Sequence, residues 1–272
     1  MAISDISLTA GMRNNLLGLQ KTANQLSSTQ DRLSSGKRVN SALDNPTNFF
    51  AAQSAMNRAS DLNDRKDGMS EAVQTIKAAD AGISAITSLI QSAKGLASAA
   101  MATNDTLSQA TYNSQFEQIQ TQITTLASDS GYRGTNLLTD GTLSLEFSAK
   151  TGDATLTVNG FESDAETLGV TNAAAWAGTT AAAASTLTQM DNALSTLRSK
   201  SSTLASNLSV ITTRQDFTTS MINTLQQGAD NLTLADMNQE GANMLMLQTR
   251  QSLGTTALSM SSQAAQSVLR LF

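Results

Sequence analysis

Apolar residues that recur at intervals of three and four near the start of the chain constrain its fold most strongly. The series is Met12, Leu16, Leu19, Ala23, Leu26 and Leu33, with Gln30 at the one polar position. This spacing places the apolar side chains along one stripe of an α-helix, in the pattern of a coiled-coil seam. A helix from Met12 to Leu33 is about 33 Å long. Ser34, Ser35 and Gly36 then predict its end, because Gly is the commonest residue just after a helix.

The second half of the chain repeats this helical pattern twice. One series consists of Leu187, Met190, Leu194, Leu197, Leu204, Leu208 and Ile211, with an interruption at Ser201. A last series consists of Met237, Leu245, Leu253, Leu258, Val268, Leu269 and Leu271, next to the final Phe272. Isolated helices rich in Ser, Thr and Asn are marginal in water. We therefore expect both ends of the chain to be frayed in a free subunit and to become ordered on assembly.

The first half of the chain predicts two further helices. Asp44, Asn45 and Pro46 supply an N-cap and a first-turn proline for a helix whose apolar stripe runs from Met69 to Ala97. A third helix is predicted from Tyr112 to Leu126, before the loop signal Asp129–Gly131.

A different pattern occupies the middle of the chain. Between Leu143 and Val158 the apolar period becomes two, on either side of the turn-like segment Lys150–Asp153. This alternation predicts a β-hairpin. Residues 171–186 are rich in Ala and Thr, and we interpret them as a surface connection or a weak helix start in which Trp176 anchors a loop.

Two residue types that are missing from the chain exclude several kinds of chemistry. The 272 residues include no His and no Cys. Without them there is no Ser-His-Asp or Cys-His nucleophile, no zinc knuckle, no iron–sulfur cluster and no disulfide. Only 4% of the residues are aromatic and the single proline is Pro46, a composition that suits long, uninterrupted helices. We expect no cofactor, no metal and no enzymatic activity.

The fold class follows from these patterns. We predict a mainly α protein, a long antiparallel coiled-coil-like helical bundle formed by the N- and C-terminal segments, with a small β-hairpin insertion.

The charge distribution argues against nucleic acid as a partner. The chain has 17 basic and 22 acidic residues, a net charge of −5. Residues 1–40 carry a net charge of +3 and residues 101–186 a net charge of −7. An acidic chain with few aromatic residues lacks the basic surface that binds phosphates. With no run of eighteen apolar residues and no secretory leader at residues 1–10, we also expect no membrane insertion.

Two charged groups have ordinary explanations. Asp236 and Glu240 lie four residues apart, on one face of a helix, but two carboxylates without a third ligand are more typical of capping or ion pairing than of a metal site. We interpret the basic residues near the N-terminus as a solvated or ion-paired face. They are Arg13, Lys21, Arg32, Lys37 and Arg38.

One continuous string identifies a family. Residues 33–44, which read LSSGKRVNSALD, resemble the N-terminal signature of bacterial flagellins. Residues 132–138 resemble the loop before that family's β-hairpin, and residues 235–240 and 268–271 resemble its last helix. The matched signature residues are Gly36, Arg38, Asn40, Asp44, Asp236 and Glu240. The resemblance covers nearly the whole chain except about residues 140–186. The chain is similar to the short, alphaproteobacterial type of flagellin that lacks large outer domains.

The resemblance implies a function and a set of partners. It implies a non-enzymatic structural subunit that polymerises into the extracellular flagellar filament for swimming motility. The implied partners are further copies of the chain, with other flagellins mixed in, together with the flagellar type III export apparatus, a C-terminal secretion chaperone, and hook-associated and cap proteins.

The resemblance also suggests how the chain is divided. Residues 1–40 and 233–272 would form a terminal helical coiled-coil domain, disordered in the monomer and located in the inner core of the filament. Residues 41–139 and 187–232 would form a helical rod, and residues 140–186 a β-hairpin and outer surface connection.

We expect the first and last helices to pair on the same and on neighbouring subunits. The predicted polymerisation interface consists of Leu16, Leu19, Leu26, Leu33, Leu253, Leu258, Val268, Leu269 and Leu271. Because an open helical polymer cannot be built from two-fold patches, these contacts would be head to tail.

Three other functions are compatible with parts of the pattern. A hook–filament junction protein would share the flagellin-like ends, and a helical translocator or effector of an injection system would share the long helices. An enzyme could use Asp and Glu alone, as glycoside hydrolases do, but no cleft-forming α/β pattern supports it.

Overall fold

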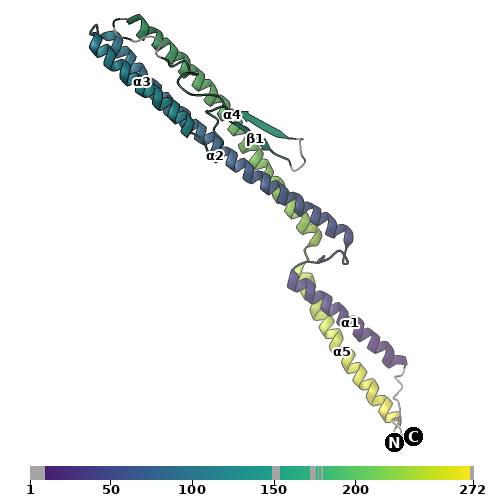
Figure 1. The fold of residues 1–272 in the computed structure, drawn as a ribbon. Coiled ribbons are helices and arrows are strands. Elements are labelled where there is room, and N and C mark those ends of the chain that lie inside the picture. Colours follow the sequence, from purple (N-terminus) through teal and green to yellow (C-terminus); the bar gives the residue numbers. More distant parts are fainter. Residues whose placement is uncertain (1–9, 149–153, 172–175, 177, 179, 270–272) are drawn as a thin grey trace. The chain divides into compact units, whose positions relative to one another are not determined.

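The computed structural model describes all residues except 1–9, 149–153, 172–175, 177, 179 and 270–272. Its helices are α1 (Ala10–Ser35), α2 (Pro46–Ala102), α3 (Thr106–Asp129), α4 (Thr180–Thr233) and α5 (Met237–Leu269). Its strands are β1 (Thr142–Glu146) and β2 (Thr155–Asn159). The predicted fold class is confirmed: the described residues are mainly helical, with one small antiparallel hairpin (Figure 1).

The chain divides into two compact units, one built from two segments distant in sequence and the other from one continuous segment. The terminal unit comprises residues 1–57 and 224–272, and the central unit comprises residues 58–223. The helices α2 and α4 each contribute to both units. The division predicted at residues 40 and 233 stays a prediction.

The helix boundaries follow the local signals in the sequence. The helix α1 ends at Ser35, and Gly36 adopts a left-handed backbone with φ of 68°. The helix α2 begins at Pro46, and the side chain of Asn45 accepts a hydrogen bond from the backbone N–H of Asn48 at 3.0 Å. Both ends were predicted. The helix α3 is longer than predicted, because Asp105 caps it by accepting from the N–H groups of Leu107 and Ser108.

The core of the central unit lies between α2, α3 and α4, which run side by side in Figure 1. The helix α2 contributes a fully buried apolar stripe with small residues between the large ones, which lets the helices approach closely. Phe116 and Ile123 from α3 and Met190 and Leu197 from α4 complete this core. The break at Ser201 in the α4 series has a cause, since its hydroxyl donates to Asp80 on α2 at 2.9 Å.

The predicted hairpin is confirmed, with Leu143 opposite Val158 and Leu145 opposite Leu156. One end of β1 is attached to two different helices of the central unit. Arg65 of α2 forms an ion pair with Glu146 at 2.9 Å, and the guanidinium of Arg214 of α4 lies 5.3 Å from the centre of the Phe147 ring. The predicted turn Lys150–Asp153 lies outside the described residues.

Of the two interpretations of residues 171–186, the helix start is confirmed, because α4 begins at Thr180. The interpretation as a surface connection is wrong for two of the described residues. Trp176 is fully buried against Phe116, with ring centres 4.9 Å apart, and Ala183 is buried in the first turns of α4. The loop-anchor interpretation of Trp176 is confirmed. Its indole N–H donates to the hydroxyl of Thr186 at 3.3 Å. Burial of a large aromatic ring outweighs the low hydrophobicity of the residues around it.

Replacing Trp176 with Ala is expected to destabilise the central unit by about 3–5 kcal/mol, because it leaves a cavity beside Phe116. The matched change Thr186→Val removes the acceptor for the indole N–H, together with the hydroxyl's own hydrogen bond to the carbonyl of Ala182, and should cost about 1–3 kcal/mol. Guanidinium unfolding followed by helical circular dichroism measures both effects. Equal unfolding midpoints for Trp176→Ala and the unchanged protein would contradict this account of the anchor.

Candidate assembly interface

The first and last helices of the chain pack against each other as an antiparallel pair within the terminal unit (Figure 1). The residues of α5 that face α1 alternate at intervals of four and three, and we call them the α5 seam. They are Glu240, Met244, Leu247, Gln251, Gly254, Leu258, Ser261 and Ala265. Glu240 and Leu247 are buried, and the others are half-buried. This is the heptad pattern of a two-stranded coiled coil.

The covered residues of α1 follow the same rule with a different phase from the predicted one. They are Met12, Leu19, Thr22, Leu26, Thr29 and Leu33. The predicted series continues from Met12 to Leu16 and from Leu19 to Ala23, in steps of four. In the structure the covered residues are instead Thr22 and Thr29, which lie three places after Leu19 and Leu26. Leu16 and Ala23 are consequently exposed. The sequence pattern predicted burial of the more apolar Leu16 and Ala23, whereas Thr22 and Thr29 are the residues that pack against α5.

The two helices approach each other closely at Gly254. A Cβ atom on Gly254 would lie 2.6 Å from a terminal methyl group of Leu19. The absence of a side chain at Gly254 therefore makes room for Leu19 between the helices. Of the predicted interface residues, Leu19, Leu26, Leu33 and Leu258 take part in this pair within one chain.

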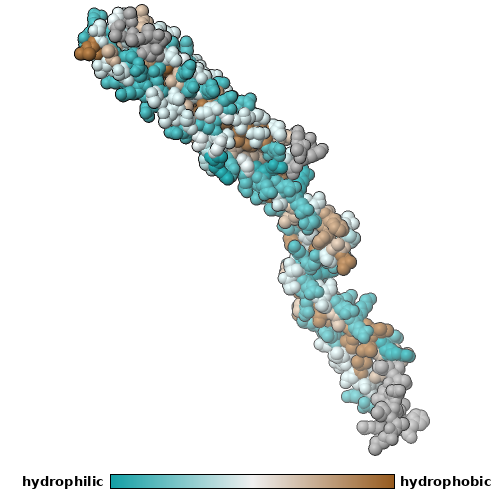
Figure 2. All heavy atoms as spheres, viewed as in Figure 1, coloured by the Kyte–Doolittle hydropathy of each residue, from teal (hydrophilic) through white to brown (hydrophobic). Residues whose placement is uncertain are grey.

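A second apolar stripe on α5 is largely exposed in the described structure. Met246, Leu253 and Met260 are seven residues apart, so they lie on one line along the helix. We call them the outward stripe. Their exposed fractions are 47%, 65% and 60%. Leu16, Leu17 and Leu245 are also exposed, and Figure 2 shows apolar side chains on the surface of this helix pair.

Two turns tie the helix pair together at the end where α1 stops and α5 starts. The N–H groups of Arg38 and Val39 donate to the carbonyl of Thr233 at 2.7 and 3.2 Å. The N–H of Ala235 donates to the carbonyl of Gly36 at 3.0 Å. These backbone bonds fix where α5 begins relative to the end of α1. The side chain of Arg38 is exposed, so its structural contribution is through its backbone.

Asp44 holds the turn after α1 in shape. Its carboxylate accepts hydrogen bonds from the backbone N–H groups of Asn40 and Ser41, both at 3.0 Å. These backbone hydrogen bonds to Ser41 and Asn40 lower the pKa of the Asp44 carboxyl below its ordinary value. The amide group of Asn40 in turn donates to the hydroxyl of Ser35 at 3.0 Å.

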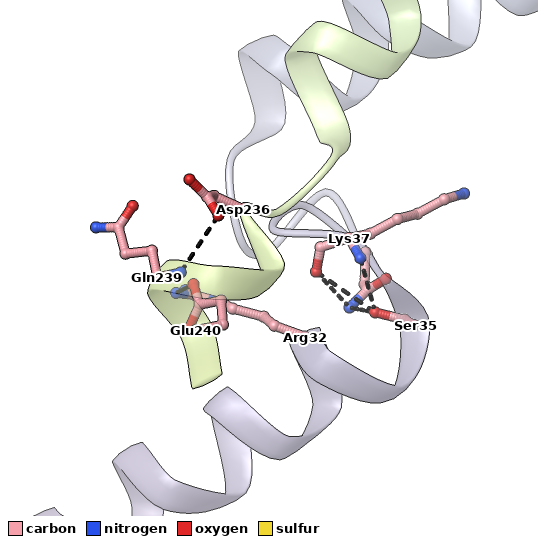
Figure 3. A network of polar contacts seen from close by, with 7 residues as sticks. Arg32, Ser35, Lys37, Asp236, Gln239 and Glu240 are labelled. Atoms are coloured by element: carbon pink, nitrogen blue, oxygen red, sulfur yellow. Dashed lines mark hydrogen bonds and ion pairs between the residues drawn. The ribbon is translucent and has the colours of Figure 1, made fainter. Parts of the chain in front are cut away.

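The two carboxylates at the start of α5 have the separate structural roles that the sequence indicated. Asp236 caps α5 by accepting from the N–H groups of Asn238 and Gln239 at 2.9 and 3.2 Å (Figure 3). Glu240 forms an ion pair with Arg32 of α1 at 3.3 Å. The second carboxylate oxygen of Glu240 is buried without a hydrogen-bond partner in the described structure. Among the described residues, no group of three potential ligands could hold a metal ion.

The six signature residues therefore gather at one place, where the two turns meet. Gly36, Arg38, Asn40 and Asp44 shape the turn after α1, while Asp236 and Glu240 start α5. Of the remaining predicted interface residues, Val268 and Leu269 fall in the last turn of α5, and Leu271 lies outside the described residues. No helix in the described part of the chain combines the length and the apolar character needed to cross a membrane.

Comparison with known proteins places these features in a family. Residues 6–142 match the family model described as "Bacterial flagellin N-terminal helical region". Flagellin FljM of Caulobacter vibrioides is 33% identical over 100% of both chains, and flagellin FljK of the same species is 32% identical over the same extent. A flagellin of Brucella melitensis is 28% identical over 93% of this chain and 94% of its own. The crystal structure of Bacillus cereus flagellin aligns with a TM-score of 0.49 and 18% identity, over 56% of this chain and 88% of that chain.

The Leu19 contact can be tested with two glycines of the same helix. Gly254→Ala should open the α1–α5 pair, because the new Cβ displaces Leu19, whereas Gly241→Ala meets nothing within 4 Å and should stabilise α5 by about 0.5–1 kcal/mol. Limited trypsin cleavage at Lys21 and Arg250 should therefore be faster in the first variant and slower in the second. Identical cleavage rates in both variants would show that the helices do not meet at Gly254.

The Asp44 turn gives a pH-dependent prediction. Because the pKa of Asp44 in the folded chain is below its ordinary value of 3.8, its contribution is present above pH 3.8 and is lost as the pH falls through the lower, folded-state pKa. Hydrogen exchange at the amides of Asn40 and Ser41 should be faster in Asp44→Ala than in the unchanged protein, and the difference should shrink below pH 3.8. A difference that persisted undiminished in acid would mean that the carboxylate charge is not responsible.

Proposed function

Because the chain belongs to the bacterial flagellin family and is a structural subunit of the flagellar filament, we propose that the outward stripe of α5 joins one subunit to the next. The observation that carries this proposal is the exposure of Met246, Leu253 and Met260 on a helix whose opposite seam is already occupied by α1. Apolar residues at seven-residue spacing are the side chains with which one helix packs into another. The α1–α5 pair thus supplies a ready-made surface for a neighbouring pair.

The proposed partner of the outward stripe is another copy of this chain. Self-polymerisation into a filament is the property that the flagellin family implies, and it places copies next to each other. We propose that the stripe meets a different patch on the neighbouring copy, because a stripe-to-stripe contact would close as a two-fold dimer, whereas a contact between two different patches is head to tail. A contact of that kind continues without closing, as an extended filament requires.

The energetics favour many neighbours over one. Full burial of an exposed Leu or Met side chain contributes about 1.5–3 kcal/mol, and the three residues of the stripe are 47–65% exposed, so burying the rest of them contributes about 3–5 kcal/mol. Association of two proteins costs about 4–15 kcal/mol in lost freedom of movement. The free energy of burial from one contact is at best about equal to this cost. A subunit that contacts several neighbours loses its freedom of movement once but gains burial at every contact. We therefore expect dimers to be weak and growth from an existing end to be favourable.

The predicted interface residues divide between these two roles in our proposal. Leu19, Leu26, Leu33 and Leu258 hold the pair within one chain, while Leu16 and Leu253 contact neighbours. Val268, Leu269 and Leu271 extend the contact at the end of the chain. The terminal segments 1–40 and 233–272 would then line the inner core, residues 41–139 and 187–232 would form the rod, and residues 140–186 would face outward.

We propose an export route that follows from the same surface. The chain would leave the cell unfolded through the flagellar type III apparatus and assemble outside it, beneath a cap protein and beyond hook-associated proteins. A chain without cysteine has no thiol that could mispair during this passage. A secretion chaperone would cover the α5 segment beforehand, because its two apolar stripes would otherwise associate in the cytoplasm.

Replacing Leu253 with Gln tests the proposal with the full-length chain. The change makes the most exposed member of the stripe polar and leaves the α5 seam intact, so folding should be preserved and filament formation lost. The matched control is Leu107→Gln on α3, where an exposed leucine belongs to the central unit. Circular dichroism checks folding, and electron microscopy of seeded samples checks assembly. Normal filaments from Leu253→Gln would refute the proposal.

A further inference from the structure

The sulfur chemistry of this chain rests entirely on methionine. The sequence contains 11 Met and no Cys. The methionines fall into distinct environments: Met69 and Met190 are fully buried in the central unit, whereas Met246 and Met260 are exposed in the terminal unit. A thioether that oxidants can reach is converted to a sulfoxide, while a buried one is protected.

Three methionines of α5 are exposed in the described structure, and two of them, Met246 and Met260, have a special position. They are the first and last members of the outward stripe, with Leu253 midway between them. Met occurs in interfaces because its long, unbranched side chain adapts to the surface it meets. At the same time its sulfur is the one atom of the stripe that an oxidant can modify. The stripe is therefore both an apolar contact surface and an oxidisable one.

We propose that Met246 and Met260 are oxidation sites that control addition of the free subunit to the filament. This inference rests on the proposed function of the outward stripe. The reagent class is a two-electron oxygen donor such as hydrogen peroxide. The methionine sulfur attacks one peroxide oxygen, the O–O bond breaks, an S–O bond forms, and the remaining oxygen leaves as water after proton transfer. The sulfur loses two electrons and the peroxide gains them.

Oxidation changes the stripe without changing the fold. A sulfoxide is polar and binds water strongly, so the oxidised stripe resists burial against a neighbour. The α5 seam contains neither residue, so the pair with α1 is retained. A subunit already in the filament has its stripe covered and is protected from the same oxidant. Oxidation thus acts on subunits before assembly and spares those after it.

The test compares the free full-length protein with assembled filaments, each treated with hydrogen peroxide and mapped by peptide mass spectrometry. Met246 and Met260 should be oxidised in the free protein and protected in filaments, with Met69 and Met190 protected in both as internal controls. The oxidised free protein should show a rise of about tenfold or more in the critical concentration for assembly. Treatment with methionine sulfoxide reductases should reverse this rise.

Two double variants assign the effect. Met246→Leu with Met260→Leu keeps an apolar stripe, so it should assemble normally and remain competent after peroxide treatment. Met56→Leu with Met101→Leu removes two exposed methionines of α2 and should remain sensitive.

The inference is overturned if the oxidised protein assembles at an unchanged concentration, or if the variant of Met246 and Met260 is as sensitive as the unchanged chain. It is also overturned if both residues oxidise equally in filaments and in free protein. Failure of the proposed function gives a different result, because Leu253→Gln would then form filaments normally. If Leu253→Gln blocks assembly and oxidation does not, only the present inference fails.

Discussion

The backbone contact between the two turns of the terminal unit is the constraint on which the rest of that unit depends. Thr233 and Gly36 are nearly two hundred residues apart in sequence, yet their carbonyls accept hydrogen bonds from Arg38, Val39 and Ala235. Closing so long a loop is unfavourable in entropy, and the cost grows only slowly with its length. Once the central unit has brought α2 and α4 together, most of that cost has already been met. The turns then set the starting point from which α1 and α5 pair.

That starting point determines which residues the seam covers. Asp236 caps α5 and Glu240 pairs with Arg32, and together these contacts fix the register of α5 against α1. Leu19 then lies opposite Gly254, and Leu247 is buried. The same arrangement leaves Met246, Leu253 and Met260 on the outside. In the proposed assembly, the signature residues of the turns would therefore act indirectly, because they set which face of α5 remains available to a neighbour.

The sequence predicted what depends on local signals and missed what depends on packing. Nearby residues determine three features that were predicted. They are the helix end at Gly36, the helix start at Pro46 and the hairpin between Leu143 and Val158. The phase of the α1 seam was not predicted, because choosing between Leu16 and Thr22 requires knowledge of the partner helix. Burial of Trp176 was only partly predicted, since the ring packs on Phe116, sixty residues earlier in the chain. Capping or ion pairing was expected for Asp236 and Glu240 together, but the sequence does not tell which carboxylate caps α5 and which pairs with Arg32.

The composition of the seam explains how folding can be linked to assembly. Thr22 and Thr29 in α1, and Gln251 and Ser261 in α5, occupy positions that Leu or Ile would fill in a stable coiled coil. A pair built this way buries little apolar surface for its length, and one carboxylate oxygen of Glu240 stays without a hydrogen-bond partner in the described structure. Its own stability is therefore small. In the proposed assembly, contact of the outward stripe with a neighbour would add apolar burial that the seam lacks, so the helix pair and the subunit contact would stabilise each other. A stronger seam would hold the pair together in the free subunit and remove that linkage.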